Sequence, residues 1–295
     1  MKTNQKESTI RSMIYGGAVG DALGAPYEYT HARDSFKVVW TGSDMTLGGC
    51  GLNKRPAGTF TDDTSMTLAS IDSMYRNHGA FVEKDMRRRF NDWWRKGAYT
   101  IDGECDDIGN TTRKSLMMGK GASEERDNGN GSLMRISFLA LTDADDDMIS
   151  GISSVTHAGH DCIMACIQWV HIIRFLLDGK DLVSSVCESD KYMEDRYGAG
   201  LTLRSILHED RESLISDGYV LNTLDTVIWV LSHHHNYHDT MIAAVGLGGD
   251  TDTIASIAGS AAGIIYGYDD IPKSWCHGIR GKAMLDHAIE QLHSV

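Results

Sequence analysis

The 295-residue sequence lacks several features that mark particular protein classes. It has only three prolines, and we find no Ser/Gly-rich linker, low-complexity tract or internal repeat. The alternation of apolar and polar residues that marks strands is nearly absent. Apolar residues instead recur with helical spacing, as in Ile10, Met13, Ile14 and Ala18. We therefore predict one all-α domain that spans residues 1–295.

Cysteine pairs and a signal sequence are also missing. The six cysteines are scattered without a C-x-x-C pair, and Met1–Gln5 opens no apolar signal core. These absences favour a reducing compartment, and we expect a cytoplasmic protein. Cys162 and Cys166 lie one helical turn apart on an apolar segment, where we expect packed thiols rather than metal ligands.

Positive charge is scarce as well. The net charge is −13, and the only basic run, Arg87–Arg89, is expected to form a solvated helix face. A nucleic acid or an anionic membrane would therefore meet a surface of like charge. The apolar part of Thr253–Tyr266 is about 14 residues long, below the roughly 20 that cross a bilayer. Its many small residues instead predict a central, closely packed helix.

Two acidic clusters stand out against this background. Thr61–Thr64 and Asp250–Thr253 each place two aspartates and two threonines where a predicted helix begins. Helix capping would explain one such residue per helix, but not two aspartates at both sites. Oxygen ligands without clustered Cys or His select Mg²⁺, Mn²⁺ or Ca²⁺, and two carboxylate groups suggest two ions about 4 Å apart. We therefore expect the clusters to form one metal centre.

Five motifs follow one another along the chain: Gly16–Glu28, Gly58–Thr64, Gly129–Arg135, Thr156–His157 and Gly248–Ala255. Their order resembles that of the ADP-ribosylglycohydrolase family, the relatives of dinitrogenase reductase-activating glycohydrolase. The resemblance covers nearly the whole chain. It implies a compact, orthogonal multi-helix bundle with a binuclear Mg²⁺ centre that hydrolyses the bond between ADP-ribose and a protein side chain.

The resemblance also implies a set of metal ligands. Two Mg²⁺ ions are expected, with Mn²⁺ as the alternative, and Thr251 is expected to point away. Vicinal ribose hydroxyls would complete the coordination shells and hold the anomeric carbon in place. The implied ligands are Thr61, Asp62, Asp63, Asp250, Asp252 and Thr253.

Two further carboxylates receive roles through the resemblance. Glu28 follows Pro26 at the start of an expected flap, where it could act as acid or base or orient water. Metal-bound aspartates such as Asp62 are alternative bases. Asp107 lies in a segment like that of members acting on ADP-ribosyl-arginine, where it would face the guanidinium; the alternative is a helix cap. Asp21 is left without a chemical role.

A glycine-rich segment before Leu133 is the expected pyrophosphate contact, because backbone N–H groups at a helix start can face a diphosphate. This contact would comprise Asn128, Gly129, Asn130, Gly131 and Ser132. His157 either lines the ADP-ribose site or is a structural residue. The run His233–His235 is expected to be a polar cluster at a helix end, because consecutive residues do not share one helical face.

These observations lead to one functional hypothesis with two alternatives. We expect a monomeric Mg²⁺-dependent hydrolase that releases ADP-ribose from modified proteins, cleaving the bond to arginine. One alternative is action on ADP-ribosyl-serine, poly-ADP-ribose or O-acetyl-ADP-ribose. The other is a non-catalytic relative that resembles the lens J1 crystallins. Loss of metal ligands would favour the latter, and the matched positions retain them all.

Overall fold

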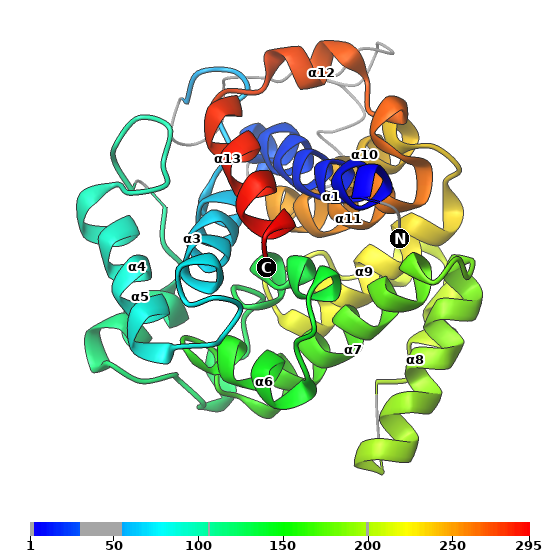
Figure 1. Ribbon diagram of the computed structural model, residues 1–295. Helices are drawn as coiled ribbons and strands as arrows, with labels where there is room; N and C mark the ends of the chain where they lie inside the picture. The colour runs from blue at the N-terminus through cyan, green and yellow to red at the C-terminus, as the bar shows by residue number, and fades with distance from the viewer. Residues whose placement is uncertain (1–2, 30–54, 106, 199–200) are drawn as a thin grey trace.

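The computed structural model describes residues 3–29, 55–105, 107–198 and 201–295, which form helices joined by turns (Figure 1). This part contains two isolated β-bridges and no strand, so the predicted all-α class is confirmed. The α-helices are α1 (Thr3–Gly24), α3 (Asp62–Arg76), α4 (Glu83–Lys96), α5 (Asn110–Met118), α6 (Asp146–Ser154), α7 (His160–Leu177), α8 (Leu182–Tyr197), α9 (Val220–His233), α10 (Tyr237–Gly246), α11 (Thr251–Tyr266), α12 (Lys273–Gly278) and α13 (Lys282–His293). Short 3₁₀ helices connect them: η1 (Ala25–Tyr27), η2 (Glu125–Asp127), η3 (Leu133–Arg135), η4 (Ser137–Leu141), η5 (Leu203–His208), η6 (Arg211–Ser213) and η7 (Tyr268–Asp270).

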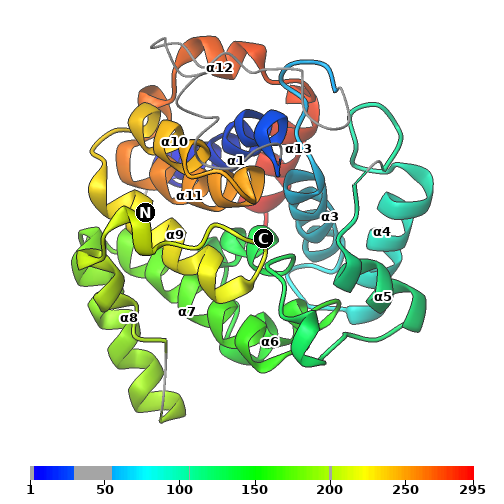
Figure 2. The same ribbon diagram turned by 180° about the vertical axis from the view of Figure 1, so that it is seen from behind.

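Helices α1 and α11 pack against each other along their lengths at the centre of the molecule (Figures 1 and 2). Glycines bring the two backbones together: a Cβ atom added at Gly16 would lie 2.3 Å from the carbonyl oxygen of Gly259, and one at Gly20 would lie 2.0 Å from that of Ala255. At Gly24 it would lie 2.4 Å from the Cα atom of Asp252. The helices are thus antiparallel, and α1 ends where α11 begins.

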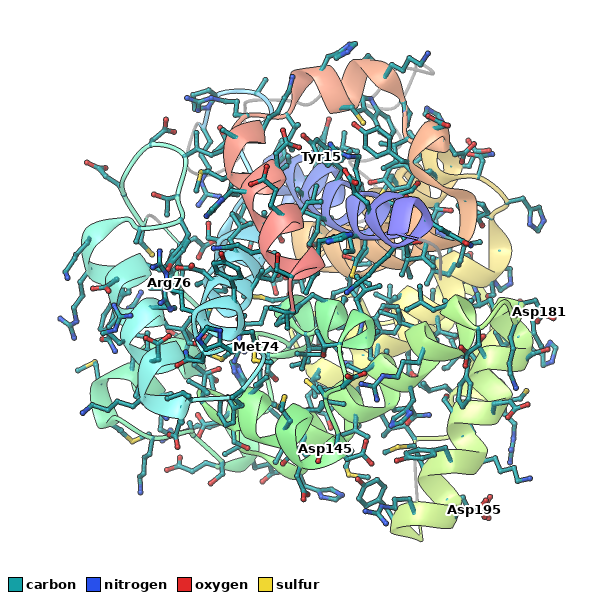
Figure 3. All side chains as sticks on the ribbon, in the orientation of Figure 1. Tyr15, Met74, Arg76, Asp145, Asp181 and Asp195 are labelled. Carbon is teal, nitrogen blue, oxygen red and sulfur yellow. The ribbon has the colours of Figure 1, made fainter. Side chains whose placement is uncertain are left out.

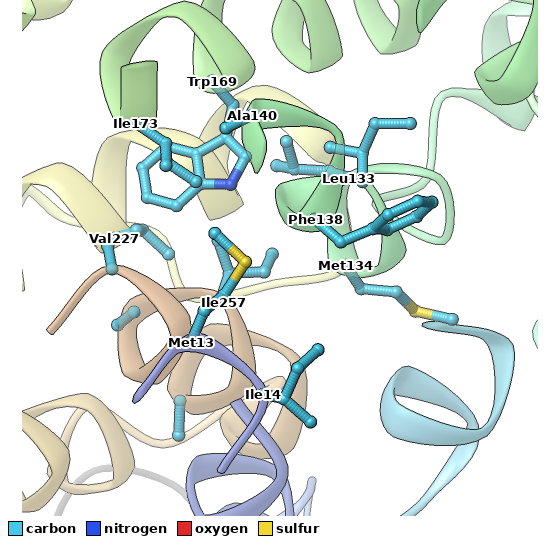
Figure 4. Close-up of a cluster of buried hydrophobic side chains, with 14 of the residues drawn as sticks. Met13, Ile14, Leu133, Met134, Phe138, Ala140, Trp169, Ile173, Val227 and Ile257 are labelled. Atoms are coloured by element: carbon cyan, nitrogen blue, oxygen red, sulfur yellow. The ribbon is translucent and has the colours of Figure 1, made fainter. Parts of the chain in front are cut away.

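Large apolar side chains from distant parts of the chain fill the interior beside this pair. Figure 4 shows Met13 from α1, Ile257 from α11, Trp169 and Ile173 from α7, and Val227 from α9 gathered in one cluster, and all are buried. Burying a side chain of this size contributes about 1.5–3 kcal/mol. This core fixes the relative positions of the helices that carry the polar residues described below.

Helix α7 is the only helix in the described residues that is long and apolar enough to span a membrane by length and composition. Most of it, 61%, is buried inside the protein. Core helices commonly pass the same test, so this feature is explained by packing. Cys162 and Cys166 on its inner face are buried free thiols, as the sequence predicts.

Three expectations about local structure were wrong. Arg89 does not lie on a solvated face, because it is buried and pairs with Asp72 and, at 2.7 Å, with Asp85. Consecutive helical residues are turned by about 100°, so one of three arginines faces inward. The apolar segment from Val155 to Leu177 predicts one long helix, but α6 ends at Ser154 and a turn precedes α7, which begins at His160. Residues after Ser132 form two 3₁₀ helices instead of an α-helix.

Candidate metal centre and active site

The structure brings the two acidic clusters together at the junction of α1, α3 and α11. Asp63 lies in the first turn of α3 and Asp252 in the first turn of α11, and both side chains are buried. Burial raises the pKa of Asp63 well above its usual value, and the charges of Asp21 and Asp62 raise it further. Burial also raises the pKa of Asp252, and the charge of Asp63 raises it further. The two clusters therefore share one electrostatic environment.

Ordinary side-chain capping does not account for these residues. Thr61 and Asp250 occupy the N-cap positions of α3 and α11, yet neither side chain accepts a capping hydrogen bond. Asp145 and Asp181, by contrast, accept such bonds from backbone N–H groups at the starts of α6 and α8, and both are exposed (Figure 3). The fold thus uses aspartate caps elsewhere, whereas the N-cap side chains of the two buried clusters do not cap their helices.

Asp21 on α1 takes over the capping of α3. One of its carboxylate oxygens accepts a hydrogen bond from the backbone N–H of Thr61 at 2.8 Å. The other accepts from the backbone N–H of Thr64 at 3.0 Å and from its hydroxyl at 2.6 Å. Asp21 is fully buried and fixes the Thr61–Thr64 peptide against α1. The sequence analysis assigned it no role, although it lies inside the Gly16–Glu28 motif.

The oxygen atoms of the first cluster leave a position for a cation. The hydroxyl of Thr61 donates to Oδ2 of Asp63 at 3.0 Å, whereas Oδ1 of Asp63 is buried without a hydrogen-bond partner. A buried carboxylate oxygen without a partner is unfavourable unless a proton or a metal ion satisfies it. Oxygen donors of this kind suit a hard divalent cation. The residues present therefore fit the expected metal.

The second cluster shows which of its side chains face the site. The carboxylate of Asp250 accepts a hydrogen bond from Nδ2 of Asn130 at 2.7 Å. Oδ1 of Asp252 accepts from the backbone N–H of Thr253 at 2.9 Å, and Thr253 is buried beside it. The hydroxyl of Thr251 donates to the carbonyl of Gly24 at 2.8 Å, so this side chain points away from the cluster.

Glu28 and Asp107 join Asp252 in a third grouping of carboxylates. One oxygen from each of these three side chains lies within 4.8 Å of the others. Burial raises the pKa of Glu28 to about 7, and the charge of Asp107 adds to this, while Arg55 opposes it. Asp107 thus lies with the acidic centre rather than apart from it. Asp106 and the expected flap beyond Tyr29 lie outside the described residues.

A cavity of about 190 Å³ opens beside the acidic centre. Asp62, which is partly exposed, and Asp107 lie in its wall together with Trp93 and Phe60. Burial and the charge of Asp107 raise the pKa of Asp62 well above its usual value. Asp102, Glu104 and Arg55 also line the cavity, which therefore places apolar, acidic and basic side chains around one space.

The glycine-rich segment, residues 128–132, contacts the turn before α9. The backbone N–H of Asn130 donates to the carbonyl of Gly218 at 3.0 Å, and that of Val220 donates to the carbonyl of Asn128 at 3.0 Å. The side chain of Asn130 connects this loop to Asp250, as described above. The hydroxyl of Ser132 is fully buried and accepts from Ser153 at 2.9 Å, so it supports the loop from inside.

His157 lies beneath the same loop. A Cβ atom added at Gly131 would approach Cε1 of the His157 ring to 2.7 Å, and one at Gly129 would lie 3.6 Å from its Nε2. Burial, with a further contribution from the charge of Arg135, lowers the pKa of His157 to about 3. The imidazole is therefore neutral at physiological pH. His233 and His234, for comparison, bond backbone carbonyls at the end of α9.

The chain is similar to known proteins along nearly its whole length. Residues 2–295 match the family model described as ADP-ribosylglycohydrolase. The chain is 31% identical to "ADP-ribosylarginine hydrolase Tri1" of Serratia proteamaculans (strain 568), covering 96% of this chain and 78% of the relative. It is 29% identical to "ADP-ribosyl-[dinitrogen reductase] glycohydrolase" of Rhodospirillum rubrum, covering 88% and 86%. It is 27% identical to "ADP-ribosylhydrolase ARH3" of Homo sapiens, covering 98% and 93%.

A solved structure shares the fold. The chain in "ADP-ribosylglycohydrolase-related protein complex" superposes with a TM-score of 0.78 at 24% identity, covering 98% of both chains. Since the family model matches almost the whole sequence, this protein belongs to the ADP-ribosylglycohydrolase family. The family and the relatives support an enzyme that acts as an ADP-ribosyl glycohydrolase.

Proposed function

We propose that this protein is a Mg²⁺-dependent hydrolase that cleaves the N-glycosidic bond of ADP-ribosyl-arginine in modified proteins. The observation that carries the proposal is the grouping of Glu28, Asp107 and Asp252, from each of which one carboxylate oxygen lies within 4.8 Å of the others. The charge of Asp63 acts on Asp252, and Oδ1 of Asp63 is buried without a hydrogen-bond partner. The arginine linkage is supported by the relatives named ADP-ribosylarginine hydrolase, at 31% and 28% identity.

Thr61, Asp62, Asp63, Asp250, Asp252 and Thr253 would hold the ions. Bound Mg²⁺ would supply a Lewis acid at the ribose hydroxyls and the water. The protein itself holds its carboxylates in place through Asp21 and Asn130, so the charges do not have to reorganise during the reaction.

Two carboxylates would handle protons and the leaving group. Glu28 is favoured as acid or base because one of its carboxylate oxygens lies within 4.8 Å of oxygens of Asp107 and Asp252, at the proposed metal centre. Asp107, in the wall of the cavity, is placed to accept hydrogen bonds from a guanidinium and to stabilise it as a cation. The protein is expected to work as a monomer, and Mn²⁺ is the alternative metal.

The test is release of ADP-ribose from arginine-ADP-ribosylated protein. Wild type should release it with Mg²⁺ and fail in EDTA, and Asp252→Ala should fail in both conditions. Asp195→Ala, on the exposed end of α8, is the matched control and should behave as wild type (Figure 3). Activity of Asp252→Ala, or of wild type in EDTA, would refute the metal-dependent mechanism.

The linkage is tested separately from the metal. Wild type and Asp107→Asn should be compared on arginine-linked, serine-linked and O-acetyl-ADP-ribose substrates and on poly-ADP-ribose. We expect wild type to prefer the arginine linkage, and Asp107→Asn to lose most of that activity. Activity restricted to serine linkages would contradict the role of Asp107. ADP-ribose binding without turnover of any substrate would instead identify a non-catalytic relative.

A further inference from the structure

Arg280, between α12 and α13, connects two segments that line the cavity beside the acidic centre. Its Nη1 and Nη2 donate to the two carboxylate oxygens of Asp102, at 3.1 and 2.9 Å. Nη1 also donates to the hydroxyl of Thr59 at 3.0 Å, and the backbone N–H of Arg280 donates to the carbonyl of Gly58 at 2.9 Å. One arginine therefore joins residues 58–59 to Asp102.

The end of this connection at residues 58–59 is firmly held. Gly58 has a φ of 79°, and a Cβ atom added there would lie 2.1 Å from the carbonyl oxygen of Gly278, so only glycine allows this approach. Thr59 is buried, and its hydroxyl donates to the carbonyl of Pro56 at 2.7 Å. The guanidinium is thus anchored to the segment that leads into the first acidic cluster.

The end at Asp102 has little other support. Residues 101–104 belong to no helix, and their backbone groups bond no other backbone group in the described part of the chain. Within that part, the two bonds from Arg280 are the only hydrogen bonds that these four residues make. Ile101 adds an apolar contact, since a Cβ atom added at Gly281 would lie 3.3 Å from its Cγ1. The position of the segment therefore depends on Arg280.

The segment 101–104 leads directly to the proposed acceptor residue. Three of its four residues line the cavity of about 190 Å³, and Cys105 and Asp107 continue the same wall. Sγ of Cys105 donates to the backbone carbonyl of Asp107 at 3.2 Å. A displacement of residues 101–104 would thus reach Asp107 through Cys105.

We propose that Arg280 is a positioning residue that acts through Asp102 to hold residues 101–104 in the cavity wall, and so sets how an acceptor arginine is received at Asp107. The identity of the acceptor rests on the proposed function, whereas the hold on the wall rests on the hydrogen bonds alone. The side chains of Arg280 and Asp102 are 34% and 53% exposed, and an exposed ion pair changes a folding equilibrium by at most about fivefold. Variants of the pair should therefore fold.

The wall can be probed without any substrate through Cys105. Its thiol is partly buried and lines the cavity, so its rate of alkylation by iodoacetamide, followed by peptide mass spectrometry, reports how far the wall opens. We expect Asp102→Ala and Arg280→Met each to raise this rate by about threefold to fivefold. Lys180→Met, which removes an exposed ion pair with Glu188, is the control and should leave the rate unchanged. Unchanged rates in Asp102→Ala and Arg280→Met, with folding checked by circular dichroism, would overturn the proposal.

A double variant shows whether the two residues act on each other. Asp102→Ala combined with Arg280→Met should be alkylated at Cys105 no faster than the faster single variant, to within about twofold, because each substitution already breaks the same connection. Rate increases that multiply in the double variant would reveal two independent effects and would contradict the role of the pair.

Kinetics on arginine-ADP-ribosylated protein test the consequence for the acceptor. We expect Asp102→Ala and Arg280→Met to raise KM for this substrate by about threefold to fivefold. The Kd of free ADP-ribose, measured by calorimetry, should change by less than about twofold, because the contacts of Asp21 and Asn130 with the acidic clusters are untouched. Equal losses in both quantities would show a general weakening of the site and would refute a role specific to the acceptor.

Failure of the proposed function remains distinguishable from failure of this inference. If wild type cleaves no arginine-linked substrate with Mg²⁺, the proposed function fails together with the acceptor role, while alkylation of Cys105 still decides whether Arg280 holds the wall. If wild type cleaves the substrate and both variants keep its KM, the proposed function stands and the inference about Arg280 is refuted.

Discussion

Replacing Glu28 with glutamine should stabilise the cation-free protein at pH 8 and change it little at pH 5. Burial and the charge of Asp107 raise the pKa of Glu28 from 4.5 to about 7 in the folded state. A group with a raised folded pKa stabilises the fold fully below its unfolded pKa, and this stability is lost as pH rises through the folded value. The relevant window is therefore pH 4.5 to 7.

The size of the effect follows from the shift. A shift of about 2.5 pH units corresponds to on the order of 3 kcal/mol, and solvent screening of the partly exposed side chain reduces this to about 1.5 kcal/mol. At an unfolding entropy of about 2.1 cal/mol/K per residue, 295 residues convert this free energy to about 2 °C in Tm.

The assay is differential scanning fluorimetry of protein freed of metal by chelation and dialysis. The Tm of Glu28→Gln should exceed that of wild type by about 2 °C at pH 8 and by only a small amount at pH 5. Saturating Mg²⁺ should reduce the difference in Tm at pH 8, because the cations neutralise the site. Glu125→Gln, at an exposed position, controls for loss of charge alone. Equal Tm values at pH 8, or a larger gain at pH 5, would mean that the charge of Glu28 is not unfavourable in the empty site.

Three other outcomes are expected. Asp252→Asn should abolish binding of Mg²⁺ or Mn²⁺ in calorimetry, while Asp239→Asn at the exposed start of α10 should not. Asp21→Asn should weaken metal binding by about 10–100-fold, because an amide cannot accept from all three donors of Thr61 and Thr64; undiminished affinity would contradict its positioning role. Gly131→Ala should lower the free energy of unfolding, measured by denaturant titration, by about 1–3 kcal/mol, because the added methyl group would lie 2.7 Å from Cε1 of the His157 ring.

The general fold was predictable because its signals are local. Helical periodicity marks α1, and the small residues of α11 predict the close packing that Gly16 and Gly259 make. The starts of α3 and α11 were visible as Asp/Thr clusters. The helix ends around residues 155–160 could not be predicted. The turn there is held by a hydrogen bond from the buried Ser153 to His157 and by a bridge between His157 and Ala122, which is distant in sequence. Local patterns do not encode such tertiary bonds.

The sequence predicted which residues belong to the candidate site better than how these residues are arranged. The carboxylates could be named, but Asp21 looked like an ordinary helix residue, since its partners at Thr61 and Thr64 lie 40 and 43 positions away. Arg89 looked solvated because the sequence does not show that Asp72 and Tyr99 cover it. Buried polar pairs of this kind depend on contacts that only the folded chain creates.

The antiparallel contact of α1 and α11 couples the stability of the fold to the candidate site. A Cβ atom added at Gly24 would lie 2.4 Å from the Cα atom of Asp252, so the helix contact at the centre of the molecule also positions a residue of the acidic centre. Heating, or a substitution that separates the two helices, should abolish ligand binding and unfold the protein in the same transition. A glycine outside the acidic clusters, such as Gly16, is therefore expected to be as sensitive to substitution as the carboxylates that it helps to align.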